Sequence, residues 1–203
     1  TTPFLNTTGL VEGVQFNDHF YLVDGDHYVL VHLSTPTSAT AVTVWGDDSP
    51  KHGPFHTDPG TVTAGCRATL ICRWGSRLVL AGYKNTPNIW FACSPDDTWP
   101  VAGSSGGSLV DGWSGSNPIG AVTGTSTNDY GTLGDPIVAI FPFAQSGLMF
   151  ACTNSFSFLT TDPAFEESVN MVSLTRSIGI AGRRAFCQSQ EKGAFILAND
   201  GLY

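Results

Sequence analysis

The sequence predicts an all-β protein, and three observations support this prediction. Short apolar runs recur along the whole chain at intervals of about 8 to 15 residues, the spacing typical of strands in sandwiches and barrels. Turn formers separate these runs, and the chain has 23 glycines and 12 prolines. Helical signals are confined to one short segment. We therefore expect a single domain over residues 1–203, a β-barrel or β-sandwich of many short antiparallel strands with long polar loops.

The clearest strand signal is a hairpin at residues 19–34. Two β-rich runs flank the turn Asp24-Gly25-Asp26, and Asp-Gly between such runs is a strong hairpin signal. The remaining runs combine β-branched and aromatic residues with flanking turn formers. They predict strands at residues 38–45, 61–74, 77–83, 88–94, 117–124, 136–143, 147–153, 155–160, 169–175 and 193–198.

A helical turn is predicted near residue 162. Asp162 can cap it, Pro163 suits the first helical position, and Glu166 follows near the positive end of the helix dipole. No other segment has these signals, so we expect at most one or two short helices.

The charge content argues against a nucleic-acid partner. Only 13% of the residues are charged, and the net charge is −8. A surface that follows phosphates needs clustered Lys and Arg. Arg67, Arg73 and Arg77 lie close together in the sequence, but we interpret them as solvated charges on edge strands. We expect neither nucleic-acid binding nor membrane insertion.

The cysteines and histidines do not form a metal-site pattern. The five cysteines include no C-x-x-C pair, and most lie in apolar runs that are typical of a core; one disulfide is left open. His52, His56 and Asp58 lie in a proline-rich segment, where their spacing gives no ligand geometry. We therefore expect no metal and no cofactor. Trp74 and Trp90 are predicted in the core.

The stretch VAGSSGGSLVDGWSG at residues 101–115 carries the most specific chemical motif. Gly103-Ser104-Ser105-Gly106-Gly107 matches G-x-S-G-G, whose glycines let backbone amides point at a developing negative charge. This loop and the runs SLV and IGAVTG that follow it resemble the chymotrypsin-like serine proteases. The resemblance implies that Ser105 is a nucleophile and that the amides of Gly103 and Ser105 stabilise the oxyanion.

A serine protease also needs a histidine and a carboxylate. The candidates are His32 with Asp47 or Asp48, which give the order His–Asp–Ser. The family's T-A-x-H turn is absent, Ser104 stands where the family usually has Asp, and 98 residues follow Ser105, a longer tail than is usual. We therefore favour interpreting the motif as a glycine-rich surface loop.

Aromatic and polar residues in turn-rich segments predict a recognition surface. Exposed aromatic rings beside Asp, Asn and Ser suit binding to sugars and proteins. The predicted loops are residues 46–60, 94–107, 111–118 and 125–135. The candidate receptor-binding residues are Asp96, Asp97, Trp99, Trp113, Asn117, Asn128, Asp129 and Tyr130.

The chain as a whole resembles the spike or protruding domains of small non-enveloped RNA virus capsids, and astrovirus spikes are similar in size. The shared features are the start at Thr1, typical of an excised domain, the low charge, the many short strands and loops such as TGTSTNDYGTLGDP at residues 123–136. The resemblance implies a homodimer on the particle whose loops contact a host receptor and attract antibodies.

The leading hypothesis from the sequence is a capsid spike domain at the virion surface. It would bind a host receptor, protein or glycan, without performing a reaction. The alternatives are a chymotrypsin-like serine protease that uses His32, Asp47 and Ser105, and a secreted carbohydrate-binding module.

Overall fold

The structure is a computed structural model, and it confirms the all-β prediction. It describes residues 5, 9–16, 19–34, 39–42, 68–93, 122–124, 133–143, 147–161, 170–189 and 193–203. In this part of the chain there are fifteen strands and no helix, so no helix there is long and apolar enough to cross a membrane. The helical turn predicted near Asp162 lies outside the described residues.

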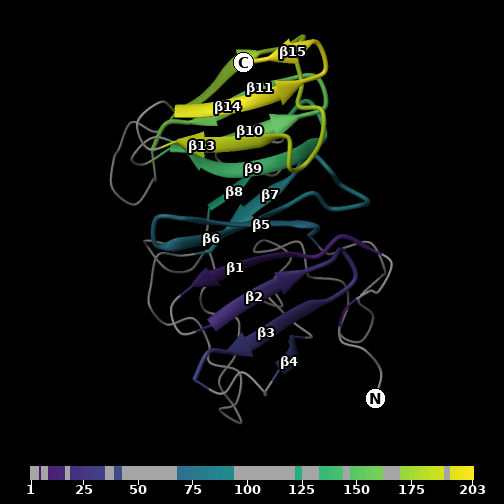
Figure 1. Cartoon of the computed structure of the whole chain (residues 1–203), viewed down its shortest axis with the longest axis vertical. Helices are drawn as coiled ribbons and strands as arrows, with labels where there is room; N and C mark the ends of the chain where they lie inside the picture. Colours follow the sequence, from purple (N-terminus) through teal and green to yellow (C-terminus); the bar gives the residue numbers. More distant parts are fainter. Residues whose placement is uncertain are drawn as a thin grey trace.

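The strands form four antiparallel sheets: the first lies at one end of the long axis, the second in the middle, and the third and fourth overlap at the end that carries the C-terminus (Figure 1). The first sheet contains β1 (Glu12–Phe16), β2 (His19–Val23), β3 (Tyr28–His32) and β4 (Ala39–Val42). The second contains β5 (Leu70–Trp74), β6 (Arg77–Ala81), β7 (Trp90–Ala92) and β8 (Val122–Gly124). The third contains β9 (Ile137–Phe143), β10 (Gly147–Cys152), β11 (Phe156–Leu159) and β12 (Met171–Thr175). The fourth contains β13 (Phe186–Ser189), β14 (Gly193–Ala198) and β15 (Gly201–Leu202).

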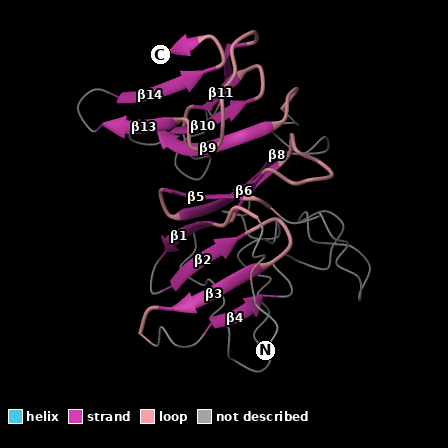
Figure 2. Cartoon of the chain, turned by 45° about the vertical axis from the view of Figure 1, so that its right-hand side comes forward, coloured by secondary structure: helices cyan, strands magenta, loops and turns pink. Residues whose placement is uncertain are grey.

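Each sheet is a meander in which strands that are consecutive in the sequence are neighbours. Turn chemistry explains two of the connections. Gly25 has φ +88° in the predicted β2–β3 turn, and Gly75 has φ +60° between β5 and β6. Glycine adopts this left-handed conformation without the steric cost that other residues incur. The sheets remain open, and the described strands do not close into a barrel (Figure 2).

Three hydrophobic cores lie between successive sheets. Alternate residues of β6 point into two of them: Leu78 and Leu80 pack towards the first sheet, and Val79 and Ala81 towards the third. The strand is therefore buried on both faces, as is β10. This explains why residues 78–81 of β6 and the whole of β10, GLMFAC, are apolar without interruption, a pattern typical of strands covered on both sides.

Aromatic residues join the sheets across these cores. The rings of Trp90 and Phe150 lie 4.8 Å apart between the second and third sheets. Phe141 and Phe186 stack at 4.1 Å between the third and fourth. Trp74 and Trp90 are both buried, which confirms their predicted core positions.

The interpretation of Arg77 as a solvated charge was wrong. Arg73 and Arg77 lie on different strands of the β5–β6 hairpin, and their register partners are Leu78 and Trp74. Arg73 is exposed, whereas Arg77 is buried and donates a hydrogen bond to the Cys93 carbonyl at 2.6 Å. The sequence also gave no separate indication of β1, β13 or β15, because these strands are short or carry polar residues.

Gly179 provides a test of the packing between the third and fourth sheets. A Cβ atom at this position would lie 1.9 Å from the backbone oxygen of Thr153, and the adjacent Ile180 amide donates to the Cys152 carbonyl at 3.1 Å. Because this backbone cannot move without breaking such bonds, Gly179→Ala should lower the free energy of unfolding by about 1–3 kcal/mol. Urea denaturation followed by tryptophan fluorescence measures the change.

Gly182→Ala is the matched control, because a Cβ atom at Gly182 meets nothing within 4 Å. This variant should be as stable as the parent, or slightly more stable. Equal stability of the two alanine variants would contradict the described packing at Gly179.

Candidate functional site

The sequence-predicted site residues lie almost entirely outside the described residues. Of the proposed triad, only the backbone of His32 is described, and Asp47 and Ser105 are not. The whole predicted receptor-binding set also lies outside the described residues: Asp96, Asp97, Trp99, Trp113, Asn117, Asn128, Asp129 and Tyr130. The histidines of the rejected metal reading, His52 and His56, are also outside.

The strands that flank the G-x-S-G-G segment are described, and they are neighbours in one sheet. β7 precedes the segment and β8 follows it, and the two strands pair antiparallel, with Trp90 opposite Gly124 and Ala92 opposite Val122. The chain therefore leaves the second sheet at Cys93 and re-enters it beside the strand it left. Residues 94–121, which contain Ser105, connect two adjacent strands.

The point of departure at Cys93 is firmly held. Its carbonyl accepts the hydrogen bond from the buried Arg77, and its amide donates to the Leu78 carbonyl at 2.9 Å. The Leu78 amide in turn donates to the Cys93 sulfur at 3.0 Å. The start of the connection that carries Ser105 is thus anchored to β6.

His32, the candidate base, is the last residue of β3. In the register of the first sheet it lies opposite His19, the first residue of β2. His19 is buried, and its ring lies 6.1 Å from that of Tyr21. The β2–β3 hairpin therefore brings two histidine positions together at the end that lies away from its turn.

The turn of the same hairpin contains a histidine–aspartate pair that sequence reasoning missed. The buried Asp24 carboxylate accepts hydrogen bonds from the amides of Asp26 at 2.8 Å and His27 at 2.5 Å. Its second oxygen lies 3.1 Å from Nδ1 of His27, whose side chain is 44% exposed. Aspartate commonly bonds the backbone two residues ahead in turns, so the sequence DGDH already carried the signal for this arrangement. A carboxylate bound to one ring nitrogen fixes the orientation of the imidazole.

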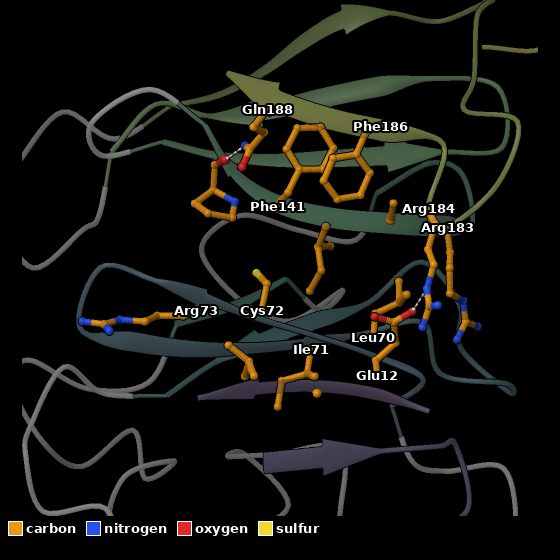
Figure 3. A pocket seen from close by; sticks show the side chains of 15 residues that line it. Glu12, Leu70, Ile71, Cys72, Arg73, Phe141, Arg183, Arg184, Phe186 and Gln188 are labelled. Carbon is orange, nitrogen blue, oxygen red and sulfur yellow. Dashed lines mark hydrogen bonds and ion pairs between the residues drawn. The ribbon is translucent and has the colours of Figure 1, made fainter. Parts of the chain in front are cut away.

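Charged, aromatic and cysteine side chains gather at a cleft between the sheets. This cleft, of about 410 Å³, is lined by residues of β1, β5, β9 and β13 and by the Arg183–Arg184 turn (Figure 3). Each of these four strands is an edge strand of its own sheet. Leu70, Cys72 and Phe141 contribute apolar surface, and Arg73 lies at the opposite end from Arg183 and Arg184.

The cysteines behave mostly as predicted. Cys72, Cys93 and Cys152 are buried, whereas Cys187 is exposed; Cys66 lies outside the described residues. Burial raises the pKa of the Cys72 thiol, and it raises the pKa of Cys152 to about 12, so both stay protonated near neutral pH. Cys72 and Cys152 are therefore not activated nucleophiles, and Cys187 is accessible to reagents.

The chain matches no protein family, and no curated protein resembles it significantly. A function must therefore be argued from its own residues.

Thiol alkylation tests the described burial of the cysteines. With iodoacetamide at pH 8, the peptide that contains Cys187 should be modified in the native protein, because this side chain is exposed. Cys72, Cys93 and Cys152 should react only after unfolding in urea. Peptide mapping by mass spectrometry separates these sites from Cys66.

Cys187→Ser is the control, and it should remove the native modification at that peptide alone. Modification of Cys93 or Cys152 in the native protein at a rate near that of Cys187 would contradict the packing of the second and third sheets.

Proposed function

We propose that the chain is a serine hydrolase that cleaves peptide bonds, with Ser105 as the nucleophile. The G-x-S-G-G motif carries this proposal, and the structure adds that the strand after the motif pairs with the strand before it, β8 with β7. In the chymotrypsin-like proteases that this segment resembles, the nucleophile loop is followed by a strand that lines the substrate cleft. The same connection, residues 94–121, also contains the predicted recognition residues Trp99 and Trp113, so the pairing of β7 with β8 holds its two ends for either function.

The mechanism follows from the chemistry that the motif supplies. The Ser105 Oγ would attack the scissile carbonyl while an imidazole, proposed to be that of His32, accepts its proton. The carboxylate of Asp47 or Asp48 would orient the imidazole and stabilise its charge. The amides of Gly103 and Ser105 would bind the oxyanion, and the imidazolium would return the proton to the leaving amine.

A fold of open sheets is compatible with a serine–histidine–carboxylate site. The chymotrypsin-like family builds two barrels, whereas the described sheets here are open. However, the serine–histidine–carboxylate arrangement occurs on unrelated folds, so the reaction depends on the site and not on a barrel.

A fluorophosphonate probe tests the proposal directly, because it labels only an activated serine. The native protein should be labelled, and Ser105→Ala should abolish labelling. His32→Ala should reduce the labelling rate by a factor on the order of 10³ or more, since loss of a triad member removes most of the catalysis. Gel fluorescence and peptide mapping give the extent and site of labelling.

Ser104→Ala is a matched control, because it removes the neighbouring hydroxyl and should leave labelling intact. Circular dichroism confirms that each variant is folded. A protein that is not labelled under any condition, or that is labelled equally after Ser105→Ala, is not a hydrolase of this type.

A receptor-binding capsid spike is the second candidate, and an exposed apolar patch favours it. The outer face and end of the fourth sheet expose Phe195, Leu197, Leu202 and Tyr203, at 40%, 51%, 71% and 57%. This patch lies at the end of the molecule that carries the C-terminus (Figure 1). Contiguous exposed apolar residues are typical of an interface, and a spike domain would use such a surface to form its homodimer.

Light scattering tests the spike candidate, because it measures whether the protein is a dimer or a monomer. A spike domain should form a dimer, and Leu197→Glu should convert it to a monomer by placing a charge in the apolar patch. Leu33→Glu is the matched control, because Leu33 is similarly exposed at 43% but follows β3 of the first sheet. Binding to host cells should be lost on Trp99→Ala or Trp113→Ala. A monomeric parent protein that does not bind cells would eliminate the spike function.

A further inference from the structure

A second cleft, lined mainly by polar side chains, lies at the third sheet. It has a volume of about 500 Å³ and is bordered by residues 133–135, by the turn between β10 and β11, and by β12. We call it the serine cleft, because Ser155, Ser157 and Ser173 all line it. Its volume lies within the range of natural ligand sites.

The register of the third sheet places two of these serines side by side. Ser157 of β11 lies opposite Ser173 of β12, and directly opposed residues of antiparallel strands project from the same face. Two residues further along, the same face carries the pair Leu159 and Met171, which packs into the core that also contains Leu133. The floor of the serine cleft therefore changes from apolar, where it joins the core, to hydroxyl-bearing.

The Ser157 hydroxyl is a buried polar group that faces this cleft. Ser157 is only 9% exposed, and its side chain makes no hydrogen bond within the part of the chain that the structure describes. Buried hydroxyl groups in proteins are normally hydrogen-bonded, because leaving one without a partner is unfavourable. A ligand hydroxyl in the serine cleft would provide that partner.

Hydrogen bonds hold the wall formed by residues 133–135 in place. The Asp135 carboxylate accepts bonds from the Asn154 amide at 2.5 Å, the Asn154 side chain at 3.4 Å and the Ser155 hydroxyl at 3.2 Å. The Leu133 amide donates to the Asn88 carbonyl, and the Asn88 side chain donates to the Leu133 carbonyl, both at 3.1 Å. These bonds compensate the charge of Asp135 and form the wall before any ligand binds, which lowers the entropic cost of binding.

Arg176 carries the charge of the serine cleft that is not compensated in this way. Its Nε donates to the Ser173 hydroxyl at 3.4 Å, and this is its one hydrogen bond or ion pair within the described residues. The guanidinium is exposed, and it has five N–H donors in a plane that suits the two oxygens of a carboxylate. The serine cleft therefore complements a ligand with an anionic group.

We propose that the serine cleft binds a sugar acid, that is, a sugar whose ring carries a carboxylate. The carboxylate would pair with Arg176, and ring hydroxyls would exchange hydrogen bonds with Ser157 and Ser173. The apolar face of the ring would lie towards Met171. A neutral sugar leaves the Arg176 charge unpaired, and a simple carboxylate leaves the Ser157 hydroxyl without a partner, so the two features together select a ligand that has both. Neither Ser105 nor the exposed apolar patch takes part, and the proposal is independent of both candidate functions.

Nuclear magnetic resonance titration of the full chain tests this proposal. The probes are the methyl glycosides of glucuronic acid, galacturonic acid and N-acetylneuraminic acid. At least one of them should bind with a Kd on the order of 1 mM or below. Each probe is matched by its own carboxamide, which keeps the hydroxyls and removes the charge, and acetate supplies a carboxylate without hydroxyls.

The carboxamide of a sugar acid that binds should have at least about tenfold lower affinity, because it cannot form charge-assisted bonds with a guanidinium. Acetate should also bind at least about tenfold more weakly, because it lacks the hydroxyl contacts. Absence of binding by all three sugar acids would overturn the proposal. So would a carboxamide or acetate that binds as tightly as the sugar acid.

Three variants locate the site. Arg176→Gln should weaken binding of the sugar acid at least about tenfold and leave the affinity of its carboxamide unchanged. Ser157→Ala should weaken binding of the sugar acid by a factor of roughly 2–10, because it removes one hydrogen bond. Arg73→Gln is the matched control, since it removes an exposed arginine that does not line the serine cleft, and it should leave the affinity unchanged.

Circular dichroism confirms that each variant is folded. Equal loss of affinity in Arg176→Gln and Arg73→Gln would show a nonspecific charge effect and refute the site. Unchanged affinity in both Arg176→Gln and Ser157→Ala would also refute it, because the sugar acid would then bind elsewhere.

Discussion

The burial of the second sheet on both faces is the constraint on which the rest of the structure depends. β6 has no exposed residue, and alternate side chains of this strand enter two different cores. Burying a leucine or valine side chain contributes about 1.5–3 kcal/mol relative to leaving it exposed, so this short strand stabilises both neighbouring sheets. Because the sheet is covered above and below, new surface can form only at its edges and in its connections. The cleft lies at one edge of this sheet, and the segment that contains Ser105 is one of its connections.

The buried Arg77 links this core to the connection that carries Ser105. Its guanidinium is removed from solvent, which is tolerated in proteins when hydrogen bonds compensate the charge. The bond to the Cys93 carbonyl provides part of that compensation. It also holds the chain at the end of β7, immediately before residue 94. A catalytic loop requires such an anchor, since small displacements of a nucleophile lower reaction rates strongly. The anchor is consistent with catalysis and equally useful to a binding loop, so the reactivity of Ser105 itself is the deciding property.

The cleft at the four edges shows how one stack of sheets can carry two unrelated surfaces. The Ser105 connection leaves the second sheet from β7 and returns in β8, the edge strand remote from β5. The cleft instead involves β5, the opposite edge of that sheet. A protein with a strongly negative net charge can thus present a local positive surface, because Arg73, Arg183 and Arg184 are gathered from positions more than a hundred residues apart in the chain.

The sequence by itself determined most of the described strands, the main turns and the core tryptophans. Apolar runs such as GLMFAC and turns such as Asp24-Gly25 carry local signals, because strand-forming side chains and positive φ angles are properties of a few neighbouring residues. Tertiary structure alone decided that Arg77 is buried while Arg73 is exposed, and that residues of four edge strands line one cleft. These outcomes depend on which sheets pack against each other, and contacts between residues distant in the chain leave no periodic pattern in the sequence. The open sheets in place of a barrel have the same origin, because closure depends on pairing between strands that are far apart in the chain.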